Sequence, residues 1–171
     1  MILIKDGRIA EDPWLSIADG VALPLWGPVI VSLARWRAER HELLARGGRI
    51  GVVLASHEPP VEIADDLAHF DLVALEFPKF TDGRAYSSAR ILRERLGFAG
   101  ELRAMGNVLR DQLAFMRRCG FDAFEVPGDA PAGQWIGALA GISVRYQPAT
   151  GFEPTAQELR RHRQPVDDTA A

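Results

Sequence analysis

The chain is poor in cysteine and has no long apolar run, and each shortage excludes a class of protein. Cys119 is the only cysteine among 171 residues. A disulfide, a CxxC redox pair and a cysteine-ligated iron–sulfur cluster are therefore impossible within one chain. The apolar start Ile2-Leu3-Ile4 is too short for a signal peptide or a membrane span. We expect a cytoplasmic protein that does not act at a membrane.

An excess of basic charge is also missing. The formal net charge is -3 at pH 7 and the pI is near 5.8. Nucleic-acid binding usually requires a strongly basic domain or stripe, so we predict no nucleic-acid partner. Apolar residues make up 47% of the chain and charged residues 25%, which is typical of a globular domain that folds on its own core.

Motifs that hold cofactors or metals are absent from the sequence. It contains no GxGxxG after a strand, no GxxxxGK[ST] and no GxSxG. The four histidines are scattered, without the HxxxH or HExxH spacing of a zinc site. They are His41, His57, His69 and His162. We therefore predict neither a cofactor nor a metal.

The chain divides into three parts by composition. Residues 1–28 begin with a predicted β-hairpin, because Asp6-Gly7 provides a tight turn between two apolar runs. Three prolines and two glycines then predict an irregular crossing over residues 13–28. Residues 29–147 form the predicted core domain. Residues 148–171 are polar and predict a flexible tail or a short exposed helix.

Within residues 29–147, short apolar runs alternate with helical periods. The predicted strands are 29–31, 50–55, 72–77, 102–105, 123–126 and 142–146. The predicted helices are 33–46, 61–69, 84–96, 108–119 and 132–140, with Ser32 capping the first and Gly47 ending it. This rhythm predicts an α/β fold with a mainly parallel sheet. An open sheet and a partial barrel both fit the pattern.

The loop Phe77–Ser88 is the first candidate site, because ligands of parallel α/β sheets collect where strands end. Lys79 and Arg84 place positive charge there, and hydroxyl groups lie near a helix start suited to an oxyanion. Sulfite, sulfate, phosphate or a carboxylate would fit. The candidate ligand-binding residues of this loop are Lys79, Arg84, Tyr86, Ser87 and Ser88. In the alternative interpretation, Asp82 caps the helix and Arg84 is solvated or paired.

The loop Gly106–Gln112 repeats this arrangement after the next strand, with Asn107 and Arg110 as candidate ligand-binding residues. If the two strands are neighbours, Arg84 and Arg110 face one ligand. Alternatively, Asn107 caps the following helix and Arg110 points to water.

Two glutamates close predicted strands and are candidate catalytic residues. Glu76 and Glu125 lie beside basic loops, where a carboxylate can act as an acid or base. They can equally pair with Arg103 or Arg110. Cys119 lies at a predicted helix C-terminus, which favours a buried structural thiol over a reactive one.

Three runs resemble an uncharacterised bacterial family whose members are commonly labelled as oxidoreductases involved in sulfite reduction. The runs are Phe77–Arg90, Gly100–Leu113 and Arg117–Glu125, and the resemblance extends over most of residues 1–147. It implies a role in assimilatory sulfate reduction, because such members tend to be encoded beside sulfite reductase and adenylyl-sulfate reductase. It implies no particular catalytic residue.

Three functions remain open from the sequence. Sulfite reduction needs a cofactor or a partner that carries one, and no motif here holds siroheme, flavin or a cluster. The leading hypothesis is therefore an accessory protein that binds a small oxyanion or sulfite reductase itself, or another enzyme of sulfate assimilation. The alternatives are an enzyme acting on a small anionic metabolite and a non-catalytic adaptor for sulfite reductase.

Overall fold

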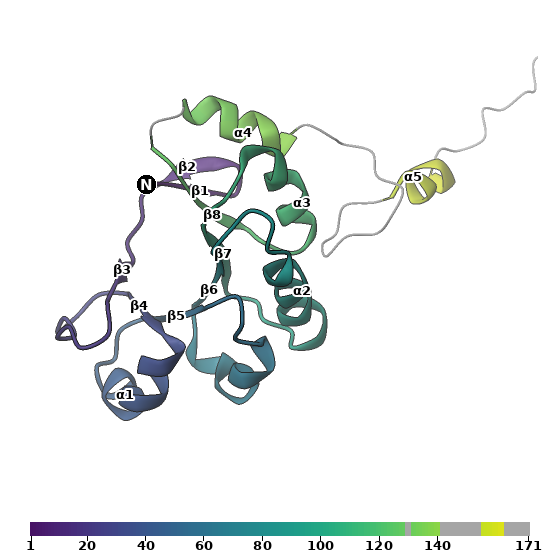
Figure 1. Ribbon diagram of the computed structural model, residues 1–171. Coiled ribbons are helices and arrows are strands. Elements are labelled where there is room, and N and C mark those ends of the chain that lie inside the picture. The colour runs from purple at the N-terminus through teal and green to yellow at the C-terminus, as the bar shows by residue number, and fades with distance from the viewer. Residues whose placement is uncertain (129–130, 141–154, 163–171) are drawn as a thin grey trace, which may run out of the picture.

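The structure is a computed structural model that describes residues 1–128, 131–140 and 155–162 (Figure 1). The strand expected at 142–146 lies outside these residues. The described residues confirm the α/β fold and the N-terminal hairpin. Asp6 and Gly7 form its turn with φ angles of 51° and 73°, as the type of turn requires.

One sheet of eight strands organises the protein. Its strands are β1 (Ile2–Lys5), β2 (Arg8–Ala10), β3 (Leu15–Ser16), β4 (Val29–Ser32), β5 (Ile50–Leu54), β6 (Leu72–Phe77), β7 (Glu101–Gly106) and β8 (Ala123–Val126). Their order is β2-β1-β8-β7-β6-β5-β4-β3. Strands β3 to β8 pair in parallel, whereas β1 is antiparallel to both β2 and β8.

Strand β3 corrects the prediction of a wholly irregular segment over residues 13–28. Leu15 pairs with Val29 and Ser16 with Ile30, which adds an edge strand to the sheet. Two residues are too few for a periodic signal, so the prolines and glycines around them dominated the sequence pattern.

The sheet is curled into a half-barrel, and the chain connectivity requires this curl. Strands β2 and β3 lie at opposite edges of the eight strands. In a flat sheet their separation would be about 34 Å, at about 4.8 Å for each pair of neighbours. Only residues 11–14 join β2 to β3, and such a link spans at most about 18 Å. The edges must therefore approach one another, which confirms the partial-barrel alternative.

Helices cover one face of the sheet, and the link of residues 11–14, here called the strap, runs along the other (Figure 1). The helical elements are α1 (Leu33–Ala45), η1 (Pro60–His69), α2 (Arg84–Arg90), η2 (Ile91–Arg95), η3 (Arg110–Gln112), α3 (Leu113–Arg118), α4 (Ala132–Ala140) and α5 (Ala156–His162). The main core lies between helices and sheet and includes Val31, Val52, Leu75 and Trp36, each at most 2% exposed.

The face away from the helices, here called the concave face, has a smaller apolar cluster. Ile30, Leu72 and Ala74 are buried there, with Trp14 of the strap packed against them. Because side chains alternate along a strand, this cluster and the main core use opposite faces of the same strands.

Local helix geometry agrees with the sequence at α1 and departs from it elsewhere. Ser32 Oγ accepts a hydrogen bond of 3.0 Å from the Arg35 N–H, which confirms the cap, and Gly47 follows the helix with φ 72°. The helix expected at 61–69 is a 3-10 helix, η1. The helix expected at 84–96 widens into the π-turn η2, where the Leu96 N–H donates to the Ile91 carbonyl. Such a turn inserts one residue, which periodicity does not reveal.

The described part of the tail contains the short helix α5. The Thr155 hydroxyl accepts a hydrogen bond of 3.3 Å from the Glu158 N–H, and the Glu158 carboxylate accepts one of 2.7 Å from the Thr155 N–H. The two side chains therefore form a reciprocal cap. None of the helices in the described residues combines the length and apolar character needed to cross a membrane.

Candidate functional site

The two predicted loops lie side by side where β6 and β7 end. These strands are neighbours in the sheet, and Phe77 pairs with Gly106. The Asn107 N–H donates to the Phe77 carbonyl at 2.7 Å. Gln112 Nε2 donates to the Phe80 carbonyl at 3.2 Å. The backbone and one side chain therefore join the loops Phe77–Ser88 and Gly106–Gln112 into one surface.

Arg84 is engaged by its own loop. Its guanidinium lies 2.6 Å from an Asp82 carboxylate oxygen, and Nη2 also donates to Ser56 Oγ at 2.8 Å. Hydrogen bonds from the Arg84 side chain and backbone hold the pKa of Asp82 far below its usual range. The Arg84 side chain remains 60% exposed. The alternative in which Arg84 is paired is thus present, with Asp82 as the partner, and the arginine also reaches Ser56 after the end of β5.

An open pocket of about 370 Å³ lies against this loop. Its lining consists of Pro78, Lys79, Thr81, Asp82 and Arg84. Lys79 is exposed and has no ion-pair partner among the described residues. The pocket therefore combines an ammonium group, a hydroxyl and an exposed guanidinium that is already paired with the Asp82 carboxylate.

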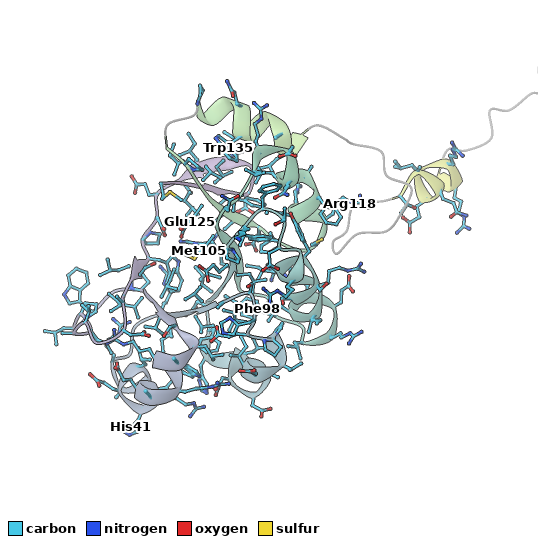
Figure 2. The ribbon with its side chains drawn as sticks, in the orientation of Figure 1. His41, Phe98, Met105, Arg118, Glu125 and Trp135 are labelled. Carbon is cyan, nitrogen blue, oxygen red and sulfur yellow. The ribbon has the colours of Figure 1, made fainter. Side chains whose placement is uncertain are left out.

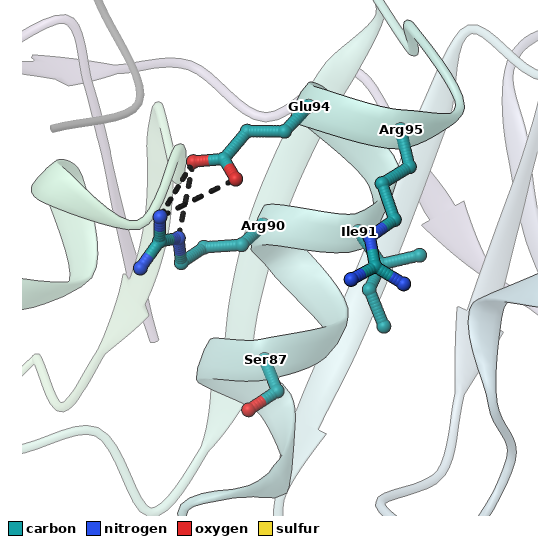
Figure 3. Close-up of a pocket in the computed structure, with 5 residues that line it drawn as sticks. All are labelled: Ser87, Arg90, Ile91, Glu94 and Arg95. Carbon is teal, nitrogen blue, oxygen red and sulfur yellow. Dashed lines mark hydrogen bonds and ion pairs between the residues drawn. The ribbon is translucent and has the colours of Figure 1, made fainter.

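The hydroxyl residues of the first loop separate instead of converging. Tyr86 packs between Phe77 and Phe115, with ring centroids 5.2 and 5.0 Å away, and burial raises its pKa. Ser88 is half-buried. Ser87 lines a different depression with Arg90, Ile91, Glu94 and Arg95 (Figure 3).

That second depression is partly neutralised. Arg90 pairs with Glu94 at 3.0 Å along α2 and η2, as Figure 3 shows. This hydrogen-bonded pair raises the pKa of Arg90. Both depressions are lined by two cations and one carboxylate, so charge does not distinguish them. The Pro78–Arg84 pocket is the better candidate because it lies where β6 ends, at the edge where ligands of parallel sheets collect.

The second loop points its arginine elsewhere. Arg110 Nη1 donates to Gln134 Oε1 of α4 at 2.9 Å, while Arg84 reaches Ser56. The two arginines therefore turn to different partners. Asn107 is exposed. The helix starts only at Arg110, after an extended Leu109, so Asn107 lies outside its first turn and does not cap it.

The two candidate glutamates lie on the concave face. Glu76 pairs with Met105 across β6 and β7. On the next strand, Phe124 pairs with Ala104. The residue after Phe124 is Glu125, so Glu125 lies level with Met105. Glu76, Met105 and Glu125 therefore form one row, with the glutamates two strands apart, or about 10 Å between backbones. Figure 2 shows Met105 and Glu125 on the side of the sheet away from α2 and α3.

The environments of these glutamates differ. Glu76 is exposed, whereas Glu125 accepts a hydrogen bond of 3.0 Å from Arg103. The predicted alternative pairing of a glutamate with Arg103 is thus correct for Glu125.

A buried ionic network centred on Arg103 was missed as a site by the sequence analysis. Arg103 is fully buried and contacts Glu101, Asp12 and Glu125 at 2.7 to 3.0 Å. Lys5 joins through Glu101 at 2.7 Å, and this hydrogen bond raises the pKa of Lys5. The alternation Glu101-Leu102-Arg103 already indicates two charges on one strand face. Asp12, 91 residues away, carries no such signal.

Cys119 is 4% exposed, and burial raises the pKa of its thiol. This agrees with the predicted structural cysteine. Within residues 1–128, 131–140 and 155–162, the histidine, cysteine and acidic side chains form no group suited to holding a metal ion.

These features define a class: an α/β half-barrel whose helix-covered parallel sheet presents polar loops at the ends of its strands. A family model described as "Bacterial protein of unknown function (DUF934)" matches residues 51–156. The chain belongs to this family. The match includes β5 except its first residue, β6 to β8 and both candidate loops. No curated protein matches the chain.

Proposed function

We propose that this chain is an accessory protein of assimilatory sulfite reduction that binds a small oxyanion at the end of β6. The observation that carries the anion site is the pocket formed by Pro78, Lys79, Thr81, Asp82 and Arg84. The protein would act in the cytoplasm, beside sulfite reductase or another enzyme of sulfate assimilation.

Charge and exposure support an anion in this pocket. The Arg84 guanidinium already binds the Asp82 carboxylate. Guanidinium groups bind negatively charged oxygen atoms well. Since Arg84 is 60% exposed, an oxyanion can reach it without unfolding the loop. Lys79 supplies a second positive charge on the same lining. A tetrahedral anion can contact both cations and the Thr81 hydroxyl.

The link to sulfite reduction depends on the resemblance of the three sequence runs. Two of them span the ends of β6 and β7, where the pocket and the joined loops lie. Six-electron reduction requires a redox cofactor, and the chain has no motif for one. Delivery of the anion or docking to the reductase is therefore the simpler role.

The test of anion binding is thermal unfolding of the full chain with sulfite, sulfate, phosphate or an adenylylated sulfate. A ligand present at one hundred times its dissociation constant adds about 2.7 kcal/mol of stability. Lys79→Ala and Arg84→Ala should each reduce this gain. Arg110→Ala is the matched control, because Arg110 is engaged by Gln134 of α4. If no anion shifts the wild type, the pocket does not bind oxyanions.

The partner is tested separately with purified sulfite reductase. Binding that strengthens with sulfite and weakens in Lys79→Ala supports the accessory role. If the affinity for the reductase changes neither with sulfite nor in Lys79→Ala, the protein is a non-catalytic adaptor instead. If the reductase does not bind at all, the docking part of the proposal is wrong, even if the thermal-unfolding test supports anion binding.

A second function is favoured by the row of Glu76, Met105 and Glu125 on the concave face. Two carboxylates in different environments can divide the roles of acid and base on a small anionic metabolite. Turnover that is lost in Glu76→Gln and Glu125→Gln but retained in Lys79→Ala would support this enzyme and argue against the accessory role.

A further inference from the structure

The buried Arg103 is held by three carboxylates of different origin. Its Nε donates to Glu101 at 2.8 Å, and its Nη1 donates to Glu125 at 3.0 Å. Both of these residues belong to the sheet. The third carboxylate, Asp12, belongs to the strap and receives bonds of 2.7 Å from Nη1 and 3.0 Å from Nη2.

The contact with Asp12 has the geometry of ligand recognition. Two parallel N–H groups of the guanidinium grip both oxygens of one carboxylate, which is how arginine binds free carboxylates and oxyanions. The Asp12 side chain is 33% exposed, whereas Arg103 is fully buried. Solvent can therefore reach the Arg103 guanidinium through the position that the Asp12 carboxylate occupies.

The strap that carries Asp12 is lightly anchored. It lies between a three-residue and a two-residue edge strand, and Glu11, Asp12 and Pro13 are exposed. Besides the Arg103 pair, it is tied down by Trp14, which packs on the concave apolar cluster and lies 5.0 Å under the Arg49 guanidinium. Exposed segments with little buried apolar contact open at low free-energy cost.

The charge of the network is compatible with an anion in place of Asp12. Without Asp12, Lys5 and Arg103 balance Glu101 and Glu125. A monoanion in the vacated fork would restore the present charge of the network. The fork would regain two charge-assisted hydrogen bonds, each stronger than a bond between neutral groups.

We propose that Asp12 is an internal ligand of an anion-binding fork on Arg103, and that a small carboxylate or oxyanion takes its place when the strap lifts. This site lies on the concave face and is independent of the Pro78–Arg84 pocket. A tethered carboxylate competes at an effective concentration of about millimolar or more. The wild type therefore binds free anions at the fork weakly, and removal of Asp12 uncovers the site.

The experiment is chemical rescue of the full-length Asp12→Ala variant with formate. Formate is the probe because it has the carboxylate of Asp12 and fits the space that the substitution vacates. The melting temperature is followed against formate concentration, with sodium chloride at matched ionic strength. We expect Asp12→Ala to bind formate at least about tenfold more tightly than the wild type, because the tethered competitor is gone.

Two further variants distinguish the fork from a general salt effect. Glu11→Ala removes the neighbouring strap carboxylate and should respond to formate as the wild type does. The double variant Asp12→Ala/Arg103→Lys retains the positive charge but loses the planar fork, so it should lose the rescue. Asp12→Ser replaces Asp12→Ala if the latter does not fold, because serine also vacates the carboxylate position, and the same direction is expected. An equal formate response in the Asp12 and Glu11 variants, or rescue that survives Arg103→Lys, overturns the proposal.

Discussion

Gly106 lies beside Phe77 where the two candidate loops begin, and its replacement by alanine should be costly. Its φ of 88° is in the left-handed region, where a Cβ costs about 1 kcal/mol. An added Cβ would also lie 2.6 Å from the Phe77 carbonyl oxygen. That oxygen accepts the 2.7 Å bond from Asn107. Displacing it weakens a hydrogen bond worth about 0.5–1.5 kcal/mol and strains the β6–β7 pairing.

Together these effects predict that Gly106→Ala lowers the free energy of unfolding by about 2–4 kcal/mol. Urea unfolding measures this loss, with an unchanged m-value showing that both variants unfold to the same extent. In a chain of this size the melting temperature should fall by about 5–15 °C.

Gly97→Ala is the matched control for the conformational part of this cost. Gly97 has φ 67°, and an added Cβ meets no atom within 4 Å. This variant should lose only about 1 kcal/mol. If Gly106→Ala and Gly97→Ala are equally destabilised, Gly106 does not lie close to the Phe77 carbonyl. The claim that the two loops form one surface would then be wrong as well.

Two further predictions concern a partly buried carboxyl group and a buried thiol. Burial raises the pKa of Asp122, although Arg93 and the Leu102 N–H contact it. Its contribution to stability is therefore present below pH 3.8 and is lost as the pH rises through the raised folded pKa. Urea unfolding at several pH values should show this loss in the wild type and not in Asp122→Asn; parallel curves would contradict it. Cys119 should react with iodoacetamide only when the protein opens, so unfolding in urea should accelerate labelling by roughly a thousandfold or more. Rapid labelling of the native protein would show that the thiol is accessible.

The fold was largely predictable because its signals are local. The alternation of apolar runs and helical periods located β4 to β8 and the helices between them, and Ser32 was identified as a cap from its position alone. The order of the strands was not predicted: the sequence analysis only considered the case in which β6 and β7 are neighbours, and the structure shows that they are. The start of α3 and the π-turn after Arg90 were missed because hydrogen bonding, not periodicity, fixes them.

The candidate site was predictable only in part. Its place at the ends of β6 and β7 follows from the rule for parallel sheets, and the structure joins the two loops there. The direction in which each side chain of the two loops points could not be predicted from this rule. Arg84 and Arg110 occupy similar positions after their strands, yet one reaches Ser56 and the other Gln134. Rotamers depend on neighbours that are distant in the sequence.

The α/β alternation, the hairpin at Asp6-Gly7 and the buried character of the strands can be predicted from the sequence, because turn chemistry and side-chain period are properties of short segments. The curl of the sheet, the course of the strap and the contact of Asp12 with Arg103 become visible only in the folded structure. These depend on bringing opposite edges of the sheet together and on a contact between residues 91 positions apart, for which no local pattern of residues provides a signal.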